Sequence, residues 1–289
     1  MMKVGIGHPA TIPGAKGQFI LEWARRADAG PFSSLGSLDR LVYPNYDALI
    51  TLTAAAAVTQ RIRLITTVLL VPLHNTGILA KQAASLDAIS GGRLTLGVGI
   101  GGRDDDFRAA PASMQGRGKR FETQLDTLTR AWSGQPLAED IGPIGPPPVQ
   151  PGGPELLIGG YSPAAIQRVG KWGNGFIAGG AQPPMARQGY ELAEKVWQEA
   201  GKPGKPRFVA ATYFGLGPNA AERAGAYIRN YYAFAGPMAE QIANGLPSTP
   251  EALKRVIQAF ADVGVDELIC WPCIQDLDQV DRLAELVGL

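Results

Sequence analysis

Cysteine and histidine are scarce in this sequence of 289 residues, which contains only two of each. The cysteines, Cys270 and Cys273, form a C-x-x-C pair and are too few for a disulfide framework. A zinc site would need two further ligands, and His8 and His74 are distant in sequence from both cysteines. We therefore expect two reduced thiols at a barrel rim rather than a redox or metal centre.

The sequence also lacks an excess of charge of either sign and long hydrophobic runs. The formal net charge is +1, and no basic or acidic block is present. This balance argues against binding to nucleic acid or to a membrane surface. The apolar runs stay far below the roughly 18 residues of a membrane span, and the N-terminal residues lack the apolar core of a signal peptide. We expect a cytoplasmic protein.

What the sequence does contain is a repeated alternation of apolar, strand-like runs and helix-like segments. Hydrophobic residues make up 45% of the chain, which suffices for a sizeable core. The expected strands cover residues 3–7, 32–38, 62–71, 93–98, 155–160, 175–178, 207–216 and 266–271. The expected helices cover residues 18–29, 46–59, 76–89, 117–132, 162–172, 183–200, 219–234, 250–263 and 276–287.

This alternation predicts the fold class. Several of the strands are apolar on both faces, which is typical of a parallel sheet covered by helices. Eight such units in one chain favour an α/β fold of the (β/α)8 TIM barrel type over an open sheet. No shift in composition marks a boundary, so residues 1–289 are expected to form a single domain. Residues 135–154, rich in proline and glycine, predict an irregular insertion after the helix of the fourth unit.

Three glycines near the fourth strand, Gly97, Gly99 and Gly102, match the G-x-G-x-x-G dinucleotide fingerprint. The match overlaps the strand itself, and the three aspartates at 104–106 would repel a phosphate. A glycine-lined strand end, where backbone approaches a flat ligand closely, is the better interpretation. The aspartates predict a solvated loop or a helix start rather than a metal site.

A second glycine-rich stretch follows the fifth strand. The strand runs into Gly159 and Gly160, and Ser162 stands at the start of the next helix. Backbone N–H groups and a hydroxyl at such a position suit a phosphate, and Gly179 with Gly180 after the sixth strand would complete the cradle. An ordinary tight turn with a serine N-cap explains the local sequence equally well.

Polar side chains stand at or just beyond several strand ends, where a barrel places its active site. They are His8, Asp39, Arg40, Thr66, Thr67 and His74. With only two histidines in the chain, each is a candidate acid or base.

Several of these segments together resemble the bacterial luciferase-like family of flavin-dependent oxidoreductases. The similar stretches are residues 61–64, Leu-Ala-Lys-Gln at 79–82, Leu-Asp-Ala-Ile-Ser-Gly-Gly-Arg at 86–93 and Leu-Gly-Val-Gly at 96–99. Ile-Gly-Gly-Tyr-Ser-Pro at 158–163, through Gly-Asn-Gly-Phe-Ile at 173–177, is similar to the family's phosphate-loop region. The resemblance covers roughly residues 3–271.

The resemblance implies a barrel that binds FMN, or alternatively the deazaflavin coenzyme F420, at the carboxyl ends of its strands. Asp39, Thr66, Thr67, Ile100 and Gly101 would then lie beside the isoalloxazine ring. The phosphate would be held by Gly159, Gly160, Ser162, Gly179 and Gly180.

The sequence also departs from the family pattern at two positions. Many members carry a histidine directly after the acidic residue at the second strand, where this chain has Arg40. The deazaflavin-dependent sugar-phosphate dehydrogenases of the family place a glutamate where this chain has Gly102. Their proton transfer cannot be carried over, so His8 is preferred over His74 as the acid or base. Arg40 is expected to bind an anionic group or to steady a reduced flavin anion.

These considerations predict a monooxygenase that oxygenates a small organic substrate with O2 and reduced FMN from a separate flavin reductase. Residues 135–154 and the loop after Gly101 are candidate lids over the substrate. Three alternatives stay open: hydride transfer with the deazaflavin, a flavin-binding protein without turnover, and a flavin-free barrel that binds a phosphorylated metabolite. Family members often dimerise, so the oligomeric state is open between monomer and homodimer.

Overall fold

The structure of the protein is a computed structural model that describes residues 1–288. Its centre is a closed barrel in which each strand pairs with the next and β8 returns to β1. The strands are β1 (Lys3–Gly7), β2 (Ser34–Ser37), β3 (Arg63–Leu70), β4 (Leu94–Gly99), β5 (Glu155–Gly159), β6 (Gly175–Ala178), β7 (Arg207–Phe214) and β8 (Glu267–Pro272). All pairs are parallel, and the predicted (β/α)8 TIM barrel is confirmed.

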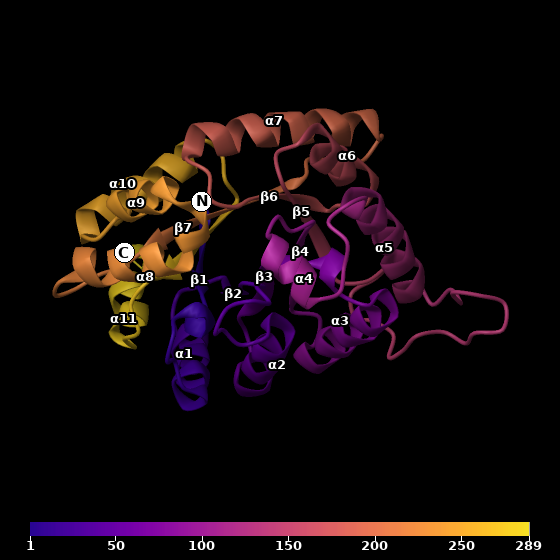
Figure 1. The fold of residues 1–289 in the computed structure, drawn as a ribbon, viewed down its shortest axis with the longest axis horizontal. Coiled ribbons are helices and arrows are strands. Elements are labelled where there is room, and N and C mark those ends of the chain that lie inside the picture. Colours follow the sequence, from indigo (N-terminus) through magenta and orange to yellow (C-terminus); the bar gives the residue numbers. More distant parts are fainter. Residues whose placement is uncertain (289) are drawn as a thin grey trace.

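Helices surround the barrel on all sides in Figure 1. They are α1 (Gly17–Ala29), α2 (Ala48–Val58), α3 (Thr76–Ser90), α4 (Asp104–Ala109), α5 (Arg117–Trp132), α6 (Pro163–Lys171), α7 (Pro183–Glu199), α8 (Ala220–Tyr231), α9 (Pro237–Asn244), α10 (Pro250–Asp262) and α11 (Asp278–Val287). Three 3-10 turns, η1 (Pro9–Thr11), η2 (Val71–Leu73) and η3 (Ala233–Ala235), complete the chain. The sequence did not predict α9 as a separate helix.

The strands are buried on both faces because side chains alternate between the helices and the barrel interior. Outward residues such as Leu35, Leu64 and Leu268 join a large core under the helices. Inward residues form a second core, the interior cluster, made of Ile65, Leu157, Ile177, Val209, Ile269 and Trp271. The barrel is therefore filled with side chains rather than hollow.

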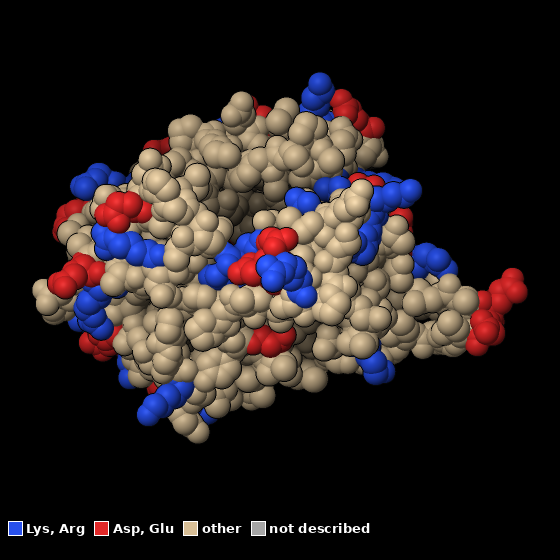
Figure 2. Space-filling view, viewed as in Figure 1, with Lys and Arg blue, Asp and Glu red and all other residues tan. Residues whose placement is uncertain are grey.

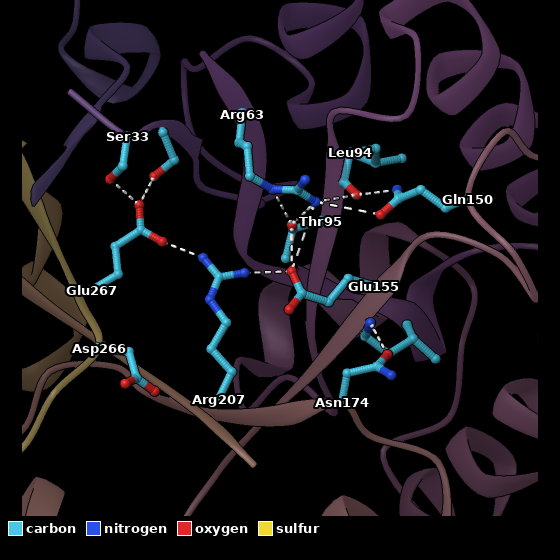
Figure 3. Close-up of polar contacts among 12 residues, drawn as sticks. Ser33, Arg63, Leu94, Thr95, Gln150, Glu155, Asn174, Arg207, Asp266 and Glu267 are labelled. Atoms are coloured by element: carbon cyan, nitrogen blue, oxygen red, sulfur yellow. Dashed lines mark hydrogen bonds and ion pairs between the residues drawn. The ribbon is translucent and has the colours of Figure 1, made fainter. Parts of the chain in front are cut away.

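A layer of charged and polar side chains closes the barrel at the amino ends of its strands (Figure 3). Arg207 reaches between Glu155 and Glu267 and forms ion pairs with both. Thr95 Oγ1 donates to Glu155 Oε2 at 2.8 Å, and Ser34 Oγ donates to Glu267 Oε1 at 2.7 Å. This polar plug fixes the end of the barrel opposite to the carboxyl ends of the strands.

The irregular insertion at residues 135–154 also belongs to the plug end. It connects α5 to β5, so it returns the chain to the amino end of a strand. Asp87 accepts the N–H of Val149 at 2.7 Å, and Gln150 contacts both Asp87 and Arg63 of the plug. Figure 1 shows the loop projecting beside α3 and α5, away from the barrel centre. The expectation that this segment is a lid is wrong, because helix-to-strand connections lie opposite to the site.

Candidate active site at the carboxyl ends of the strands

The carboxyl ends of the strands surround a depression with an apolar floor. The interior cluster, which includes Trp271, is packed against by Leu38, Val68, Ala211 and Tyr213, which come from β3, β7 and the loop directly after β2. Figure 2 shows a hollow at the centre of this face, with charged side chains gathered beside it over α4. An apolar floor with polar groups at its rim is the usual form of a small-molecule site.

One wall of this depression is lined by glycine. Alternation from Ile177 and Leu157 places Gly159 and Gly179 on the inner face of β5 and at the end of β6. A Cβ atom at Gly99 would lie 2.9 Å from Val68 Cγ2, and one at Gly159 would lie 3.1 Å from Val68 Cγ1. The absent side chains thus leave room for Val68, which turns inward where the register between β3 and β4 shifts after Thr67.

The two threonines at the end of β3 have different surroundings. Thr66 Oγ1 donates to the Gly97 carbonyl at 2.8 Å, so its hydroxyl is used within the sheet. Thr67 lies on the inner face, and its Oγ1 is buried with no hydrogen-bond partner among the described residues. The indole Nε1 of Trp271 is likewise buried and unpaired. Buried polar atoms are nearly always paired in folded proteins, so these two point to a polar ligand at the floor.

The apolar floor and the two unpaired atoms fit a flat heterocycle with polar edges, such as a flavin. The other two residues assigned to the ring are arranged differently. The side chain of Ile100 packs outward against the core under the helices, which leaves only its backbone for the site. Gly101 has a φ of +70°, and Arg117 Nε donates to its carbonyl at 3.2 Å.

The residues predicted to hold a phosphate lie in the loops after β5 and β6. The Tyr161 hydroxyl donates to the Gly179 carbonyl at 3.5 Å and ties the two loops together. Gly179 and Gly180 are exposed, and a Cβ atom at either would meet nothing within 4 Å. Ser162 Oγ caps α6 by accepting the Ala165 N–H at 3.2 Å. Open backbone at a helix start suits a phosphate, and the same contacts suit an ordinary N-cap.

His8 is placed where it cannot easily exchange protons. Its side chain is fully buried, Nε2 donates to the Ile20 carbonyl at 3.1 Å, and Nδ1 has no partner among residues 1–288. Desolvation by this burial lowers the pKa of His8 to about 3, despite the opposing hydrogen bond to Ile20. The ring is therefore neutral near pH 7, and its predicted role as an acid or base gains no support from its position.

Asp39 and His74 form a pair at the rim between β2 and β3. His74 Nε2 donates to Asp39 Oδ2 at 3.1 Å, and the same oxygen accepts the Leu70 N–H at 2.8 Å. Burial alone would lower the pKa of His74, but the hydrogen bond and charge of Asp39 raise it overall. Asp39 is thus engaged with the end of β3 and the turn after it, and His74 is the more accessible of the two histidines.

Arg40 lies on aromatic faces at the same rim. Its guanidinium carbon is 4.2 Å from the ring centre of Tyr43, 5.1 Å from Tyr231 and 5.6 Å from Phe234. Nη1 donates to the Tyr231 carbonyl at 2.9 Å. Arg103, from the loop after β4, also stacks on Phe234, with its guanidinium carbon 3.9 Å from the ring centre.

A helical segment between β7 and α10 covers part of the mouth. The Gly215 N–H donates to the Pro247 carbonyl at 3.3 Å. The chain therefore leaves the end of β7 and returns beside it after residues 216–246, which contain α8, η3 and α9. We call this segment the cap. Thr11 Oγ1 shares a hydrogen bond of 2.7 Å with the Tyr227 hydroxyl, and Tyr213 shares one of 2.8 Å with Tyr232. The sequence did not predict the cap, and the aromatic density of residues 227–234 is the one sequence signal of it.

The cysteine pair and the aspartates at 104–106 do not form a redox or metal site in the described structure. Cys270 and Cys273 are buried free thiols, and burial raises the pKa of Cys270 to about 12, so neither is an exposed redox group. Within residues 1–288, no group of three or more metal-ligating side chains converges. The aspartates at 104–106 start α4, and none of the described helices has the length and apolarity to cross a bilayer.

Comparisons with known proteins agree with this architecture. An uncharacterized protein of Mycobacterium tuberculosis is 30% identical over 194 residues, which span 64% of this chain and 68% of that protein. An F420-dependent secondary alcohol dehydrogenase, solved with an F420-acetone adduct, superposes with a TM-score of 0.83 at 18% identity, covering 100% of this chain and 99% of the other. The FMN complex of the oxygenating constituent of 3,6-diketocamphane monooxygenase from Pseudomonas putida gives 0.75 at 17%, covering 99% and 96%.

The two solved structures, both below 25% identity, establish the fold alone. The family follows from the sequence itself, because the luciferase-like monooxygenase profile matches residues 2–287. This chain belongs to the luciferase-like monooxygenase family of oxidoreductases.

Proposed function

We propose that this protein is a flavin-dependent monooxygenase that oxygenates a small organic substrate with O2. A separate reductase supplies reduced FMN, because the sequence offers no nicotinamide site. The observation that carries the proposal is the pair of buried, unpaired polar atoms, Thr67 Oγ1 and Trp271 Nε1, beside an apolar floor at the carboxyl ends of the strands. The family membership and the FMN-bound relative support this choice of cofactor.

Bound reduced FMN supplies the electrons that activate O2. The residues of this chain would position the cofactor and exclude water from the substrate. Gly160, Ser162, Gly179 and Gly180 would hold the phosphate, and Thr67 with Trp271 would offer polar contacts to the ring. The cap, with its buried tyrosines, would exclude water from the substrate above the floor.

Proton transfer is not assigned to His8, because a neutral, buried ring cannot donate a proton at pH 7. His74, held by Asp39, is the histidine that retains partial access to solvent. Any proton needed during turnover would pass through this pair or through water.

The cofactor site is tested by filling it. Gly179 has open space around its Cβ position, so Gly179→Leu should fold normally and project into the proposed site. We expect this variant to bind FMN at least tenfold more weakly than the wild type in a fluorescence titration. Gly142→Leu, at another exposed glycine with open space, is the matched control and should bind normally. Equal FMN affinity of all three proteins would place the flavin elsewhere.

The reaction type is tested with the cofactor varied. The purified protein is mixed without oxygen with reduced FMN or reduced F420 and a panel of small organic substrates, and products are measured after O2 is admitted. We expect an oxygenated product with FMN only. Tight binding of the deazaflavin, with substrate reduced and no oxygenated product, would instead identify a hydride-transfer enzyme.

A further inference from the structure

Two arginines from different loops converge at the rim of the candidate site. Arg40 follows β2 and Arg103 follows β4, and both guanidinium groups stack on Phe234 of the cap, at 5.6 and 3.9 Å from its ring centre. Burial and the nearby charge of Arg103 lower the pKa of Arg40, which reflects how close the two cations are. Asp105 and Asp106 offset part of the repulsion between the two arginines, so the case for a further anion depends on which arginine donors they leave unpaired.

The carboxylates of this region pair directly with Arg103, whereas they act on Arg40 only through longer-range charge. Arg103 Nη2 donates to Asp105 at 2.9 Å, and its Nε lies 3.4 Å from Asp106 Oδ2. The other oxygen of Asp106 accepts the N–H groups of Leu41 and Val42, at 3.1 and 2.6 Å. Among residues 1–288, no carboxylate lies within 4 Å of the Arg40 guanidinium, whose one hydrogen bond is to the Tyr231 carbonyl.

Donor atoms of both arginines are left over. Arg40 Nε and Arg103 Nη1 are buried and have no hydrogen-bond partner among the described residues. Arg103 Nε faces Asp106 only at ion-pair distance and makes no hydrogen bond. Guanidinium N–H groups match the oxygens of a carboxylate in geometry and charge. A ligand carboxylate would pair these donors and balance the charge of Arg40.

We propose that Arg40 and Arg103 form an anion subsite that binds the carboxylate of the substrate, so that the oxygenated substrate is a small organic acid. This inference rests on the proposed function, since it places the substrate beside the flavin site. The aromatic faces of Tyr43, Tyr231 and Phe234 then provide apolar contact for the body of that acid. Arg40 and Arg103 are specificity residues in this arrangement.

Benzoate and benzamide provide a matched pair of probes that differ in charge and not in shape. Each is titrated into the FMN-loaded protein, and binding is followed by the flavin absorbance and by tryptophan fluorescence. We expect the wild type to bind benzoate at least tenfold more tightly than benzamide. In Arg40→Gln and Arg103→Gln this preference should fall below threefold.

Arg108 offers a control on the same rim. It is exposed on α4 and pairs with Asp104, so Arg108→Gln removes one positive charge without touching the subsite. We expect its benzoate preference to equal that of the wild type. Equal binding of the two probes by the wild type would overturn the inference, as would an unchanged preference in both glutamine variants.

A purely structural role for the cluster is distinguished by lysine variants. Arg40→Lys and Arg103→Lys keep the charge and the stacking but lose the forked donors, so the cap should remain attached even if a glutamine variant fails to fold. We expect the benzoate preference to fall at least threefold in both, with melting temperatures close to that of the wild type. Lowered melting temperatures in both glutamine variants, with an unchanged benzoate preference, would show that the cluster only fastens the cap.

The cofactor phosphate is a second source of an anion, and comparing FMN with riboflavin separates the two sources. If Arg40→Gln and Arg103→Gln weaken FMN tenfold but leave riboflavin unchanged, the pair holds the cofactor phosphate and the substrate inference is overturned. We expect the two flavins to be affected equally and weakly. If the wild type binds no flavin, the proposed function fails, and the benzoate test on the flavin-free protein still decides the anion subsite.

Discussion

The two histidines experience opposite electrostatic surroundings although both follow strand ends. His8 is fully buried, and within residues 1–288 its side chain has the Ile20 carbonyl as its one hydrogen-bond partner, whereas His74 faces the carboxylate of Asp39. Burial dominates the first case and the charge of a partner dominates the second. The two histidines should therefore change the pH dependence of the free energy of unfolding in opposite directions.

His8 should make the fold sensitive to acid. The unfolded chain protonates this residue near the ordinary histidine pKa of 6.5, while the native pKa is about 3, so the unfolded state binds more protons between these values. Stability contributed by His8 is full above pH 6.5 and is lost as the pH falls toward 3, by up to about 1.4 kcal/mol per pH unit. Urea unfolding of the wild type and His8→Gln at pH 7, 5 and 4 should give converging free energies. Parallel curves would contradict the buried, neutral ring.

His74 should act in the opposite direction. Its native pKa is raised above 6.5, so the stabilisation from the pair with Asp39 is full below the unfolded pKa and is lost as the pH rises through the native pKa. The gap in unfolding free energy between the wild type and His74→Gln should be about 1 kcal/mol at pH 5.5 and should shrink by pH 9. In an Asp39→Asn background the gap should no longer depend on pH, and a persistent dependence there would assign the effect to another group.

The residues of the candidate site were predictable only in part. Glycines at 159, 160, 179 and 180 could be found because a strand end followed by glycine leaves a local signal. The different hydrogen bonding of the Thr66 and Thr67 hydroxyls could not be predicted, because it depends on a register shift between β3 and β4. Arg103 was missed because its neighbours in sequence are acidic, and its contact with Phe234 joins loops far apart in the chain.

At the scale of elements, hydrophobic periodicity located the strands and the long helices, since each buries a continuous face. The observed β2 begins two residues later and ends one residue earlier than expected, and β7 ends two residues earlier than expected. The cap was not predicted, because α8 and α9 become a cap only through their return to Gly215. The insertion at residues 135–154 was placed at the wrong end, although its position between a helix and a strand already determines which end it joins.

The cap should depend on the buried contact between Thr11 and Tyr227. Tyr227→Phe removes the hydroxyl and leaves Thr11 Oγ1 without its partner, which costs about 1–3 kcal/mol in the local opening of α8. Hydrogen exchange should accelerate in α8 while the barrel strands remain protected. Tyr46→Phe is the control, since the Tyr46 hydroxyl donates to the Ala15 carbonyl outside the cap. Equal exchange in α8 of both variants would show that this bond does not hold the cap.

At the scale of the whole molecule, the barrel separates stability from chemistry. The candidate site is at the carboxyl ends of the strands, and the polar plug is at their amino ends (Figure 3). The interior cluster lies between them and is apolar. A change in the plug should therefore alter the stability of the barrel without changing the affinity of the site for its ligands.

Arg207 is the residue on which the plug depends, because it bridges Glu155 and Glu267. Arg207→Met leaves Glu267, whose side chain is 2% exposed, as a buried charge without its partner. The free energy of unfolding should fall by about 3–5 kcal/mol, since breaking a buried pair costs more than the pair contributes. Lys205→Met, which removes an exposed cation paired with Glu194, should cost less than about 1 kcal/mol. Adding Glu267→Gln to Arg207→Met should recover part of the lost free energy of unfolding, because it removes the unpaired charge of Glu267.

The affinity of these variants for FMN should stay within about twofold of the wild type at temperatures where each variant is folded. A larger change would mean that the two ends of the barrel are energetically coupled.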